Sequence, residues 1–458
     1  MNNQTILKNQ TIEAIDKQYV WHPFTQMKEW QEESQLVITG GEGIRLCDQD
    51  GNWYYDGNSS MWVNLHGHRR PELDEAITHQ LESIAHSTFL GMTSPPGVLL
   101  AKELISISPP GLTRVFYSDS GSEAVEIALK IAFQYWQQRE NPVPSKTRFL
   151  HLVNSYHGDT IGSVSVGGIE LFHSTYHPML FPTISIPCPY CYRCPFGCDQ
   201  NTCEKKCLDS LQTVIQEQHE NIAAFIIEPL VMGAAGMLTF PPGYLTKVRE
   251  LCSTYHILLI ADEVATGFGR TGKMFACDHE GICPDIMTVA KGLTGGYLPL
   301  AATLTTEEIF NAFLGEPNES RTFYHGHSYT GNQLACAVAR ANLELFRKDQ
   351  IIPALSEKIR VIESGLERFR TLSHVGEIRQ VGMMVGIELV KNPDSREPYL
   401  PEDGVIKSVI LGAQHRGMIT RPLGDVIVFL PPLSSTLVEL QAMLNILFES
   451  IRSAQVIE

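Results

Sequence analysis

Three polar segments follow short apolar runs in the sequence, and their side chains could act together. Asp262 follows LLIA, Lys291 follows IMTVA, and the segment 118–123 (SDSGSE) follows VFY and opens a helical pattern. Ligands of open α/β sheets bind at the carboxyl ends of parallel strands. If the three runs are parallel strands, a lysine, a carboxylate and a turn with free N–H groups meet at one edge of one sheet.

Pyridoxal phosphate requires this combination of groups. The N–H groups and dipole at the start of a helix bind a phosphate, and a lysine amine forms a Schiff base with the aldehyde. A carboxylate beside the pyridine nitrogen keeps it protonated, so that the ring can accept electrons. Each residue alone has a commoner explanation: a solvated lysine, an ion pair or a helix cap. Together they predict a pyridoxal phosphate site, with Lys291 as the Schiff-base residue and Asp262 beside the ring nitrogen.

The elements that must position these residues form an α/β pattern. Between 114 and 292, short apolar runs are each followed by a helical pattern, which is typical of parallel strands buried on both faces. From about Thr330 the helical segments lengthen, and short strand candidates lie at 384–390 and 426–432. We predict the α/β class, with a large domain on a mostly parallel sheet flanked by helices and a smaller α+β domain. The predicted segments are 1–60, an N-terminal arm that completes the small domain; 61–329, the cofactor-binding domain; and 330–458, the C-terminal small domain.

Composition excludes several classes of function. The 458 residues carry a formal net charge of -16, which would repel nucleic acids and anionic membrane surfaces. The polar N-terminus shows no secretory signal, and the most apolar stretch, 223–240, is interrupted by Glu228 and Pro229. We therefore expect a cytoplasmic protein without nucleic-acid or membrane partners.

The sequence resembles the class III (omega) aminotransferases of fold type I over essentially the whole chain. That resemblance implies a homodimer with active sites at the subunit interface. It also implies that Gly121 and Ser122 bind the cofactor phosphate, that Tyr156 stacks on the ring, and that His327 and Ser328 contact the cofactor, Ser328 from the neighbouring subunit. The segments that carry the resemblance are SDSGSEAVEIALK (118–130), YHGD (156–159), IIEP (226–229), ADEVATGFGRTGK (261–273), AKGLTGGYLP (290–299) and HSYTGNQLACAVA (327–339).

Within this family, the chain looks like the branch that aminates 8-amino-7-oxononanoate in biotin biosynthesis. The similar segments are WHPFTQM (21–27), SSMWVNLHGH (59–68) and Arg421 with the proline that follows it. In that branch an arginine at the position of Arg421 binds the substrate carboxylate, which suits the planar donor pair of a guanidinium. Ala265 replaces a glutamine typical of glutamate-using relatives. The resemblance predicts that the substrate contacts Phe24, Met61, Trp62, Tyr156, Lys291, Gly326 and Arg421.

The amino donor depends on small differences in the same segments. Relatives that use S-adenosylmethionine typically carry HPYT, SSWW and GPT, where this chain has Phe24 in HPFT, Met61 in SSMW and Ser328 in GHS. The loss of a hydroxyl and an indole favours lysine over S-adenosylmethionine, although contacts of ~1–3 kcal/mol can switch a substrate. Another omega-aminotransferase, acting on 4-aminobutyrate or diamines, remains an alternative.

A cysteine cluster lies between Cys188 and Cys207. Four of its members have the spacing of the bacterial iron–sulfur run, but the prolines are placed differently, no second run exists, and transamination needs no electron carrier. We predict no metal, and a metal or redox protein remains the alternative. The four cysteines in that spacing are Cys188, Cys191, Cys194 and Cys198, and Cys203 precedes Cys207.

Overall fold

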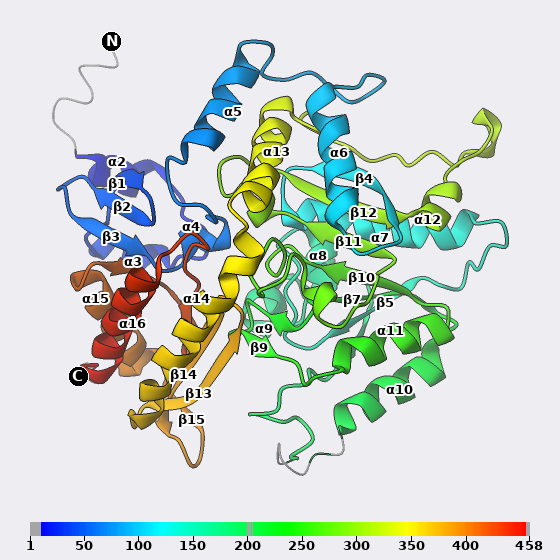
Figure 1. Ribbon diagram of the computed structural model, residues 1–458. Coiled ribbons are helices and arrows are strands. Elements are labelled where there is room, and N and C mark those ends of the chain that lie inside the picture. The colour runs from blue at the N-terminus through cyan, green and yellow to red at the C-terminus, as the bar shows by residue number, and fades with distance from the viewer. Residues whose placement is uncertain (1–10, 199–202, 204, 455–458) are drawn as a thin grey trace.

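The computed structural model describes residues 11–198, 203 and 205–454. Its centre is a seven-stranded sheet with the order β4-β12-β11-β10-β7-β5-β6 (Figure 1). Strand β12 is antiparallel to both of its neighbours, β11 and β4. The strands from β11 to β6 are parallel to one another. This mostly parallel sheet confirms the predicted α/β class. The strands are β4 (Leu112–Ser118), β5 (Arg148–Leu152), β6 (Ile184–Ile186), β7 (Ile222–Ile227), β10 (Leu258–Asp262), β11 (Ile286–Val289) and β12 (Ala301–Thr306).

The middle strands are apolar along their length because helices cover both faces of the sheet. All residues of β7, β10 and β11 are buried, as is usual for parallel strands between two helical layers. Ile226 packs on one face with helix α7 (Gly121–Gln138). Its neighbour Phe225 points to the other face, where the hydrophobic core includes helices α10 (Lys206–Gln218) and α11 (Tyr244–Thr254). The three layers fix the carboxyl ends of the strands relative to one another.

Two smaller sheets lie beside the central one. In the first, strand β16 pairs in parallel with β3, so a C-terminal strand completes an N-terminal hairpin sheet. The second has the order β13-β14-β18-β17, and β15 pairs with β14. The division into segments 1–60, 61–329 and 330–458 remains a prediction. The strands are β1 (Ile38–Glu42), β2 (Arg45–Asp48), β3 (Trp53–Asp56), β13 (Val375–Val381), β14 (Met384–Asn392), β15 (Glu397–Pro398), β16 (Met418–Ile419), β17 (Pro422–Leu423) and β18 (Val426–Phe429).

Helix α13 (Gln333–Lys348) runs through the middle of the molecule (Figure 1). It packs against α5 (Pro71–Leu81), α6 (Pro95–Ile107) and the short helix η3 (Lys291–Thr294). Its Asn342 side chain donates hydrogen bonds to the carbonyls of Gly292 and Leu293, which fixes the turn after β11. Other helices are α2 (Ile12–Tyr19), α3 (Met27–Glu32), α4 (Ser59–Trp62), α8 (Ile161–Ser165), α9 (Glu170–His173), α12 (Glu307–Asn311), α14 (Ile351–Leu366), α15 (Val405–His415) and α16 (Leu437–Arg452).

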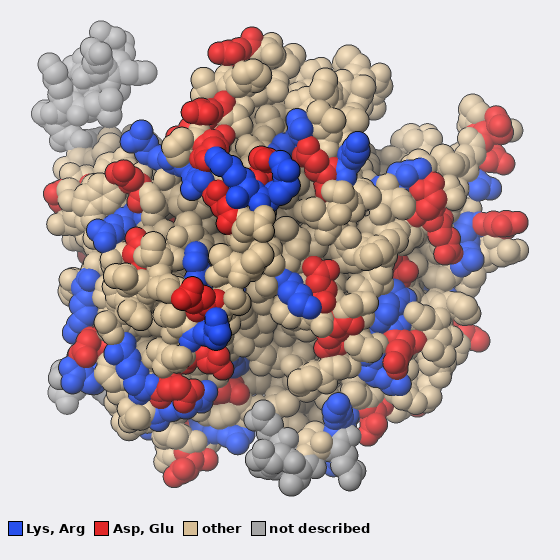
Figure 2. Space-filling model, in the orientation of Figure 1, with Lys and Arg blue, Asp and Glu red and all other residues tan. Residues whose placement is uncertain are grey.

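The surface carries both signs of charge. Figure 2 shows lysine and arginine side chains interspersed with aspartate and glutamate over the visible face. Within the part of the chain that the structure describes, no helix has the length and apolar character needed to cross a membrane.

Candidate active site

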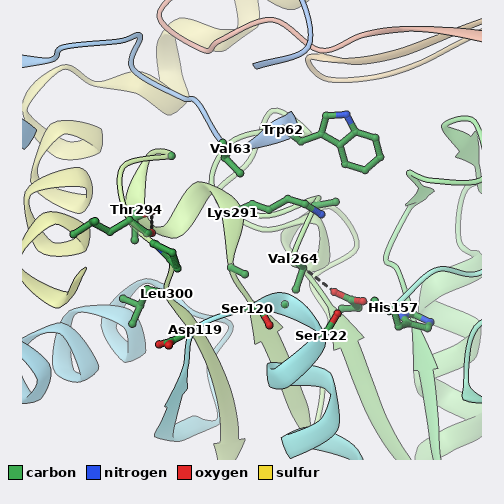
Figure 3. A pocket seen from close by; sticks show the side chains of 18 of the residues that line it. Trp62, Val63, Asp119, Ser120, Ser122, His157, Val264, Lys291, Thr294 and Leu300 are labelled. Carbon is green, nitrogen blue, oxygen red and sulfur yellow. Dashed lines mark hydrogen bonds and ion pairs between the residues drawn. The ribbon is translucent and has the colours of Figure 1, made fainter. Parts of the chain in front are cut away.

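A cavity of about 430 Å³ lies at the carboxyl ends of the parallel strands (Figure 3). It brings together Lys291, Asp262, Tyr156 and the start of α7, as the sequence predicted. Lys291 lies between Trp62 and the Ser120 turn in this view. The other residues of the lining include Val63, Asp119, Gly121, Ser122, His157, Gly158, Glu228, Val264, Ala265, Ala290, Thr294 and 296–300.

The turn after β4 forms a cradle for an anion. The Ser120 hydroxyl accepts the N–H of Glu123 at 3.3 Å, and the Glu123 carboxylate accepts the N–H of Ser120 at 3.0 Å, which closes a capping box. The next N–H groups, of Gly121 and Ser122, belong to the first turn of a helix, where no intrahelical partner exists. A Cβ at Gly121 would lie 2.7 Å from Val264 Cγ1, so only glycine fits this turn. These free N–H groups and the helix dipole suit a phosphate.

Asp262 ends β10 with its carboxylate held from several sides. Its Oδ2 lies 2.7 Å from Nδ1 of His157, and both side chains are buried. Its Oδ1 accepts the N–H of Val264 at 3.1 Å and the hydroxyl of Thr288 at 3.3 Å. The carboxylate is therefore fixed in one orientation at the floor of the cavity. We did not predict the role of His157, although it lies in the YHGD segment, because it meets Asp262 only in the folded chain.

Lys291 follows β11 in a left-handed backbone conformation, with φ of 43°. Its Nζ lies 5.1 Å from the centre of the Trp62 ring. Removal from bulk water lowers the pKa of Lys291, while attraction to Asp262 and Glu228 opposes that shift. A lowered pKa increases the fraction of neutral amine, which is the nucleophilic form.

Tyr156 follows β5 and contributes a phenol to the cavity. Its hydroxyl donates to Asp159 Oδ2 at 2.6 Å, and the N–H of Asp159 donates to Ser122 Oγ at 3.0 Å. Burial and the neighbouring Asp159 carboxylate raise the pKa of Tyr156, so the phenol stays neutral. This chain of contacts ties Tyr156 to the phosphate cradle.

A second cavity, of about 420 Å³, contains Arg421 and Phe24. Nη1 of Arg421 lies 3.0 Å from Sδ of Met61, whose neighbour Trp62 lines the first cavity. No ion pair of Arg421 is present among residues 11–198, 203 and 205–454. The guanidinium is therefore available to an anionic ligand. The φ angles from Ser59 to Trp62 are all positive, 46° to 70°. This unusual turn places Trp62 in the first cavity and Met61 against Arg421 of the second.

Comparison with known proteins places the chain in a family. The family model for "Aminotransferase class-III" matches residues 26–451. The chain belongs to the class III aminotransferases. It is 52% identical to a protein of Anoxybacillus flavithermus, over 98% of each chain, and 50% identical to one of Geobacter sulfurreducens, over 97% of this chain and 98% of the other. Both are named adenosylmethionine-8-amino-7-oxononanoate aminotransferase.

Solved structures agree with this assignment. The crystal structure of the enzyme of that same name from Methanocaldococcus jannaschii superposes with a TM-score of 0.92, at 47% identity, over 96% of this chain and 98% of the other. An omega transaminase from Pseudomonas jessenii, solved in complex with PMP, superposes with a TM-score of 0.90 at 32% identity, over 96% and 97% of the two chains. This class III aminotransferase depends on pyridoxal 5'-phosphate.

The residues of the first cavity fit that cofactor. The cradle at Gly121 offers donors to a phosphate, and Asp262 offers a carboxylate to a protonated ring nitrogen. Nζ of Lys291 makes no hydrogen bond to any other residue that the structure describes, so the amine is available for bonding. The first cavity of the aminotransferase thus contains an anion-binding turn, a carboxylate for the ring nitrogen and a free amine.

Four predicted residues lie outside both cavity linings: Met61, which contacts Arg421, and Gly326, His327 and Ser328. Nδ1 of His327 is 3.6 Å from Oδ2 of Asp119, which lines the first cavity, and the Ser328 carbonyl is 2.7 Å from Nε2 of His86. The contacts predicted for His327 with the cofactor, for Gly326 with the substrate and for Ser328 with the cofactor of the neighbouring subunit remain predictions.

The cysteine segment serves as a connection between sheets in this aminotransferase. The side chains of Tyr190 and Arg193 bond Glu388 of β14, at 2.6 and 2.8 Å. Across the described residues, no three metal-ligating side chains are arranged to hold an ion, and all eleven cysteines are free thiols. That no metal binds to this segment, which includes Cys188, Cys191, Cys194, Cys198, Cys203 and Cys207, stays a prediction.

Proposed function

We propose that this aminotransferase converts 8-amino-7-oxononanoate to 7,8-diaminononanoate in biotin biosynthesis. The observation that carries the proposal is the unpaired guanidinium of Arg421, in a cavity next to the one that contains Lys291. The substrate has a carboxylate at one end of a methylene chain and the reacting oxo carbon near the other. Arg421 would bind the carboxylate with charge-assisted hydrogen bonds. The names of the relatives from A. flavithermus and G. sulfurreducens support this substrate.

We propose the following roles around the cofactor. Pyridoxal phosphate, when bound, supplies a ring that accepts electrons from the carbon next to the reacting nitrogen. Gly121 and Ser122 hold its phosphate, and Tyr156 stacks on the ring. Lys291 holds the cofactor covalently, and Asp262, positioned by His157, keeps the ring nitrogen protonated.

Lys291 also moves the proton in each half-reaction. With the cofactor bound, the donor amine would take the place of Lys291, whose lowered pKa favours the neutral amine. The freed amine would take the proton from the amine-bearing carbon of the donor, becoming an ammonium, and would return it to the bound cofactor. In the second half-reaction the same amine returns a proton to the carbon that becomes the new amine centre. Trp62 covers Lys291 Nζ and limits access of water to it.

The donor is lysine or S-adenosylmethionine. Phe24 and Met61 favour lysine, whereas the names of the relatives from A. flavithermus and G. sulfurreducens favour S-adenosylmethionine. A homodimer is part of the proposal, with Ser328 at the cofactor phosphate of the neighbouring subunit, His327 at the cofactor and Gly326 at the substrate. The cytoplasmic location remains a prediction.

Rapid-mixing half-reactions test the substrate. The holoenzyme is first converted to its amino form with excess donor, lysine in one arm and S-adenosylmethionine in the other, and the donor is then removed. We expect 8-amino-7-oxononanoate to restore the original visible spectrum, and 2-oxoglutarate and succinic semialdehyde to leave the amino form unchanged. Failure of 8-amino-7-oxononanoate to restore it contradicts the proposal. Restoration by succinic semialdehyde would favour an omega-aminotransferase that acts on 4-aminobutyrate.

A further inference from the structure

Glu228 is a buried carboxylate at the cavity to which no role has yet been given. It follows β7, lines the cavity, and is only 4% exposed. No cation forms an ion pair with it among the residues described on either side of the gaps at 199–202 and 204. A buried carboxylate without a salt bridge is costly unless hydrogen bonds satisfy it. Hydrogen bonds must therefore offset the cost of burying the Glu228 carboxylate.

Both oxygens of Glu228 accept backbone N–H groups from two separate segments. Oε1 accepts the N–H of Tyr156 at 3.1 Å, after β5. Oε2 accepts the N–H of Gly233 at 3.0 Å, in the turn between β8 (Val231–Met232) and β9 (Leu238–Thr239). One side chain thus joins the loop after β5, which contains Tyr156, to a separate hairpin.

The hairpin contact reaches Trp62. A Cβ added to Gly233 would lie 2.9 Å from Cζ3 of Trp62, so the glycine backbone lies directly against the indole ring. The other edge of the indole is fixed, because its Nε1 donates to Asn58 Oδ1 at 2.9 Å. The same ring lies over Lys291 Nζ. Glu228 therefore connects Tyr156 on one wall of the cavity to Trp62 on another.

We propose that Glu228 is a positioning residue that holds Tyr156 and Trp62 at the spacing needed to bind the oxo substrate beside Lys291. The inference rests on the proposed function for the identity of that substrate. Only a carboxyl group offers two acceptor oxygens to two N–H donors at this size, because an amide has one oxygen and one NH₂ group. Glutamine at this position must therefore point a donor at an N–H.

The environment of Glu228 is consistent with such a structural carboxyl group. Burial raises the pKa of Glu228 to about 7, Asp262 adds to this shift, and His157 and the two N–H donors oppose it. The other titratable groups that interact electrostatically with Glu228 are Lys291, Tyr156 and the Cys188 thiol. Both protonation states retain acceptor oxygens for the two N–H groups, so the connection does not depend on ionisation.

The test compares Glu228→Gln with Glu228→Asp and with a matched control, Glu263→Gln. Glu263 is also fully buried at a strand end, but its carboxylate accepts the Thr266 hydroxyl and the Cys277 N–H and does not line the cavity. For Glu228→Gln we expect KM for 8-amino-7-oxononanoate to rise about tenfold, which equals about 1.4 kcal/mol, with kcat changed less than threefold. Glu228→Asp, which keeps both acceptor oxygens, should show a smaller rise in KM than Glu228→Gln. Glu263→Gln should shift the melting temperature without altering KM.

A second measurement does not depend on turnover. A crystal structure of the cofactor-free Glu228→Gln protein should show the backbone at Tyr156 or Gly233 moved and the Trp62 ring displaced. Unchanged KM together with an unmoved Trp62 overturns the inference, and so does a kcat loss of more than a hundredfold at constant KM, which would make Glu228 a proton-transfer group. If the wild type fails to aminate 8-amino-7-oxononanoate, the proposed function fails, and the same comparison is made with the oxo substrate that the half-reactions identify.

Discussion

The chemistry of the cavity depends first on the charge state of one amine. Lys291 is surrounded by the carboxyl groups of Asp262 and Glu228, yet removal from water lowers its pKa. Desolvation therefore outweighs the attraction of two acids, and the lowered pKa of Lys291 increases the fraction of neutral, nucleophilic amine. The same acids limit how far the pKa falls, so the protonated form stays accessible for returning a proton.

Replacing Lys291 with alanine tests this residue directly. Loss of the amine removes both the covalent anchor and the proton carrier, and general acid–base groups alone contribute about 10²–10⁴-fold. We expect kcat to fall by at least that factor. After borohydride reduction, mass spectrometry should find the cofactor mass on the wild-type chain and on the Lys273→Ala chain, in which an exposed lysine outside the cavity lining is replaced. Cofactor mass on the Lys291→Ala chain would show that another residue holds it.

Arg421 is predicted to select the substrate by its carboxylate. Replacement with alanine leaves that carboxylate without a cation, and a hydrogen bond to a charged group contributes about 1.5–3 kcal/mol. KM for 8-amino-7-oxononanoate should therefore rise roughly ten- to a hundredfold. The KM of Arg421→Lys should lie between those of the wild type and Arg421→Ala, because an ammonium keeps the charge without the planar donor pair. Steady-state kinetics with an oxo compound that lacks the carboxylate provides the control, since its KM should not change. An equal rise in KM for both compounds would show that the substrate carboxylate does not bind at Arg421.

At the scale of elements, buried groups at the strand ends affect the free energy of unfolding as well as the chemistry of the cavity. Glu263 follows β10, and burial raises the pKa of Glu263 to about 7, above its ordinary value near 4.5. The unfolded chain releases this proton at lower pH than the folded chain does. The group therefore lowers the free energy of unfolding as pH rises from about 4.5 to about 7, by up to about 3 kcal/mol, and not further above that.

Glu263→Gln removes this pH dependence. Between pH 5.0 and pH 7.5 the melting temperature of the wild type should fall relative to that of the variant, because only the wild-type unfolded state gains from ionisation. Differential scanning calorimetry of both proteins at the two pH values measures the difference. A melting-temperature difference that does not change with pH would mean that Glu263 is ionised in the fold, with a pKa near its ordinary value.

Elements dominated by local patterns could be predicted from the sequence. The apolar runs before Asp262 and Lys291 form β10 and β11, and the SDSGSE segment opens α7. The sequence did not predict the reversed direction of β12, because an antiparallel strand inside this sheet is as apolar as its neighbours. It also did not predict the pairs His157–Asp262 and Glu228–Tyr156, because each joins residues more than 70 positions apart. Those contacts arise from strand order, which local spacing does not specify.

At the scale of the whole molecule, the predicted homodimer would explain a region of exposed apolar side chains. Leu90 is 87% exposed and Tyr324 is 80% exposed, and Met92 and Tyr329 are more than half exposed. The two segments that carry them lie together, because the rings of His86 and Tyr329 are 4.9 Å apart. Apolar surface of this kind is typical of protein interfaces. The same segments contain Ser328, whose predicted contact is with the cofactor of the other subunit.

Leu90→Asp tests the dimer against a matched control. Two chains of 51.1 kDa form a particle of about 102 kDa, which light scattering resolves from the monomer. A charge at Leu90 should weaken the dimer and reduce bound cofactor and activity together, because burying an unpaired carboxylate in an interface is costly. Val438→Asp places the same charge at an equally apolar site, 75% exposed on α16, and should leave mass and activity unchanged. A Leu90→Asp protein that keeps the dimer mass would move the interface to another face, whereas a fully active monomer would show that one chain completes its own site.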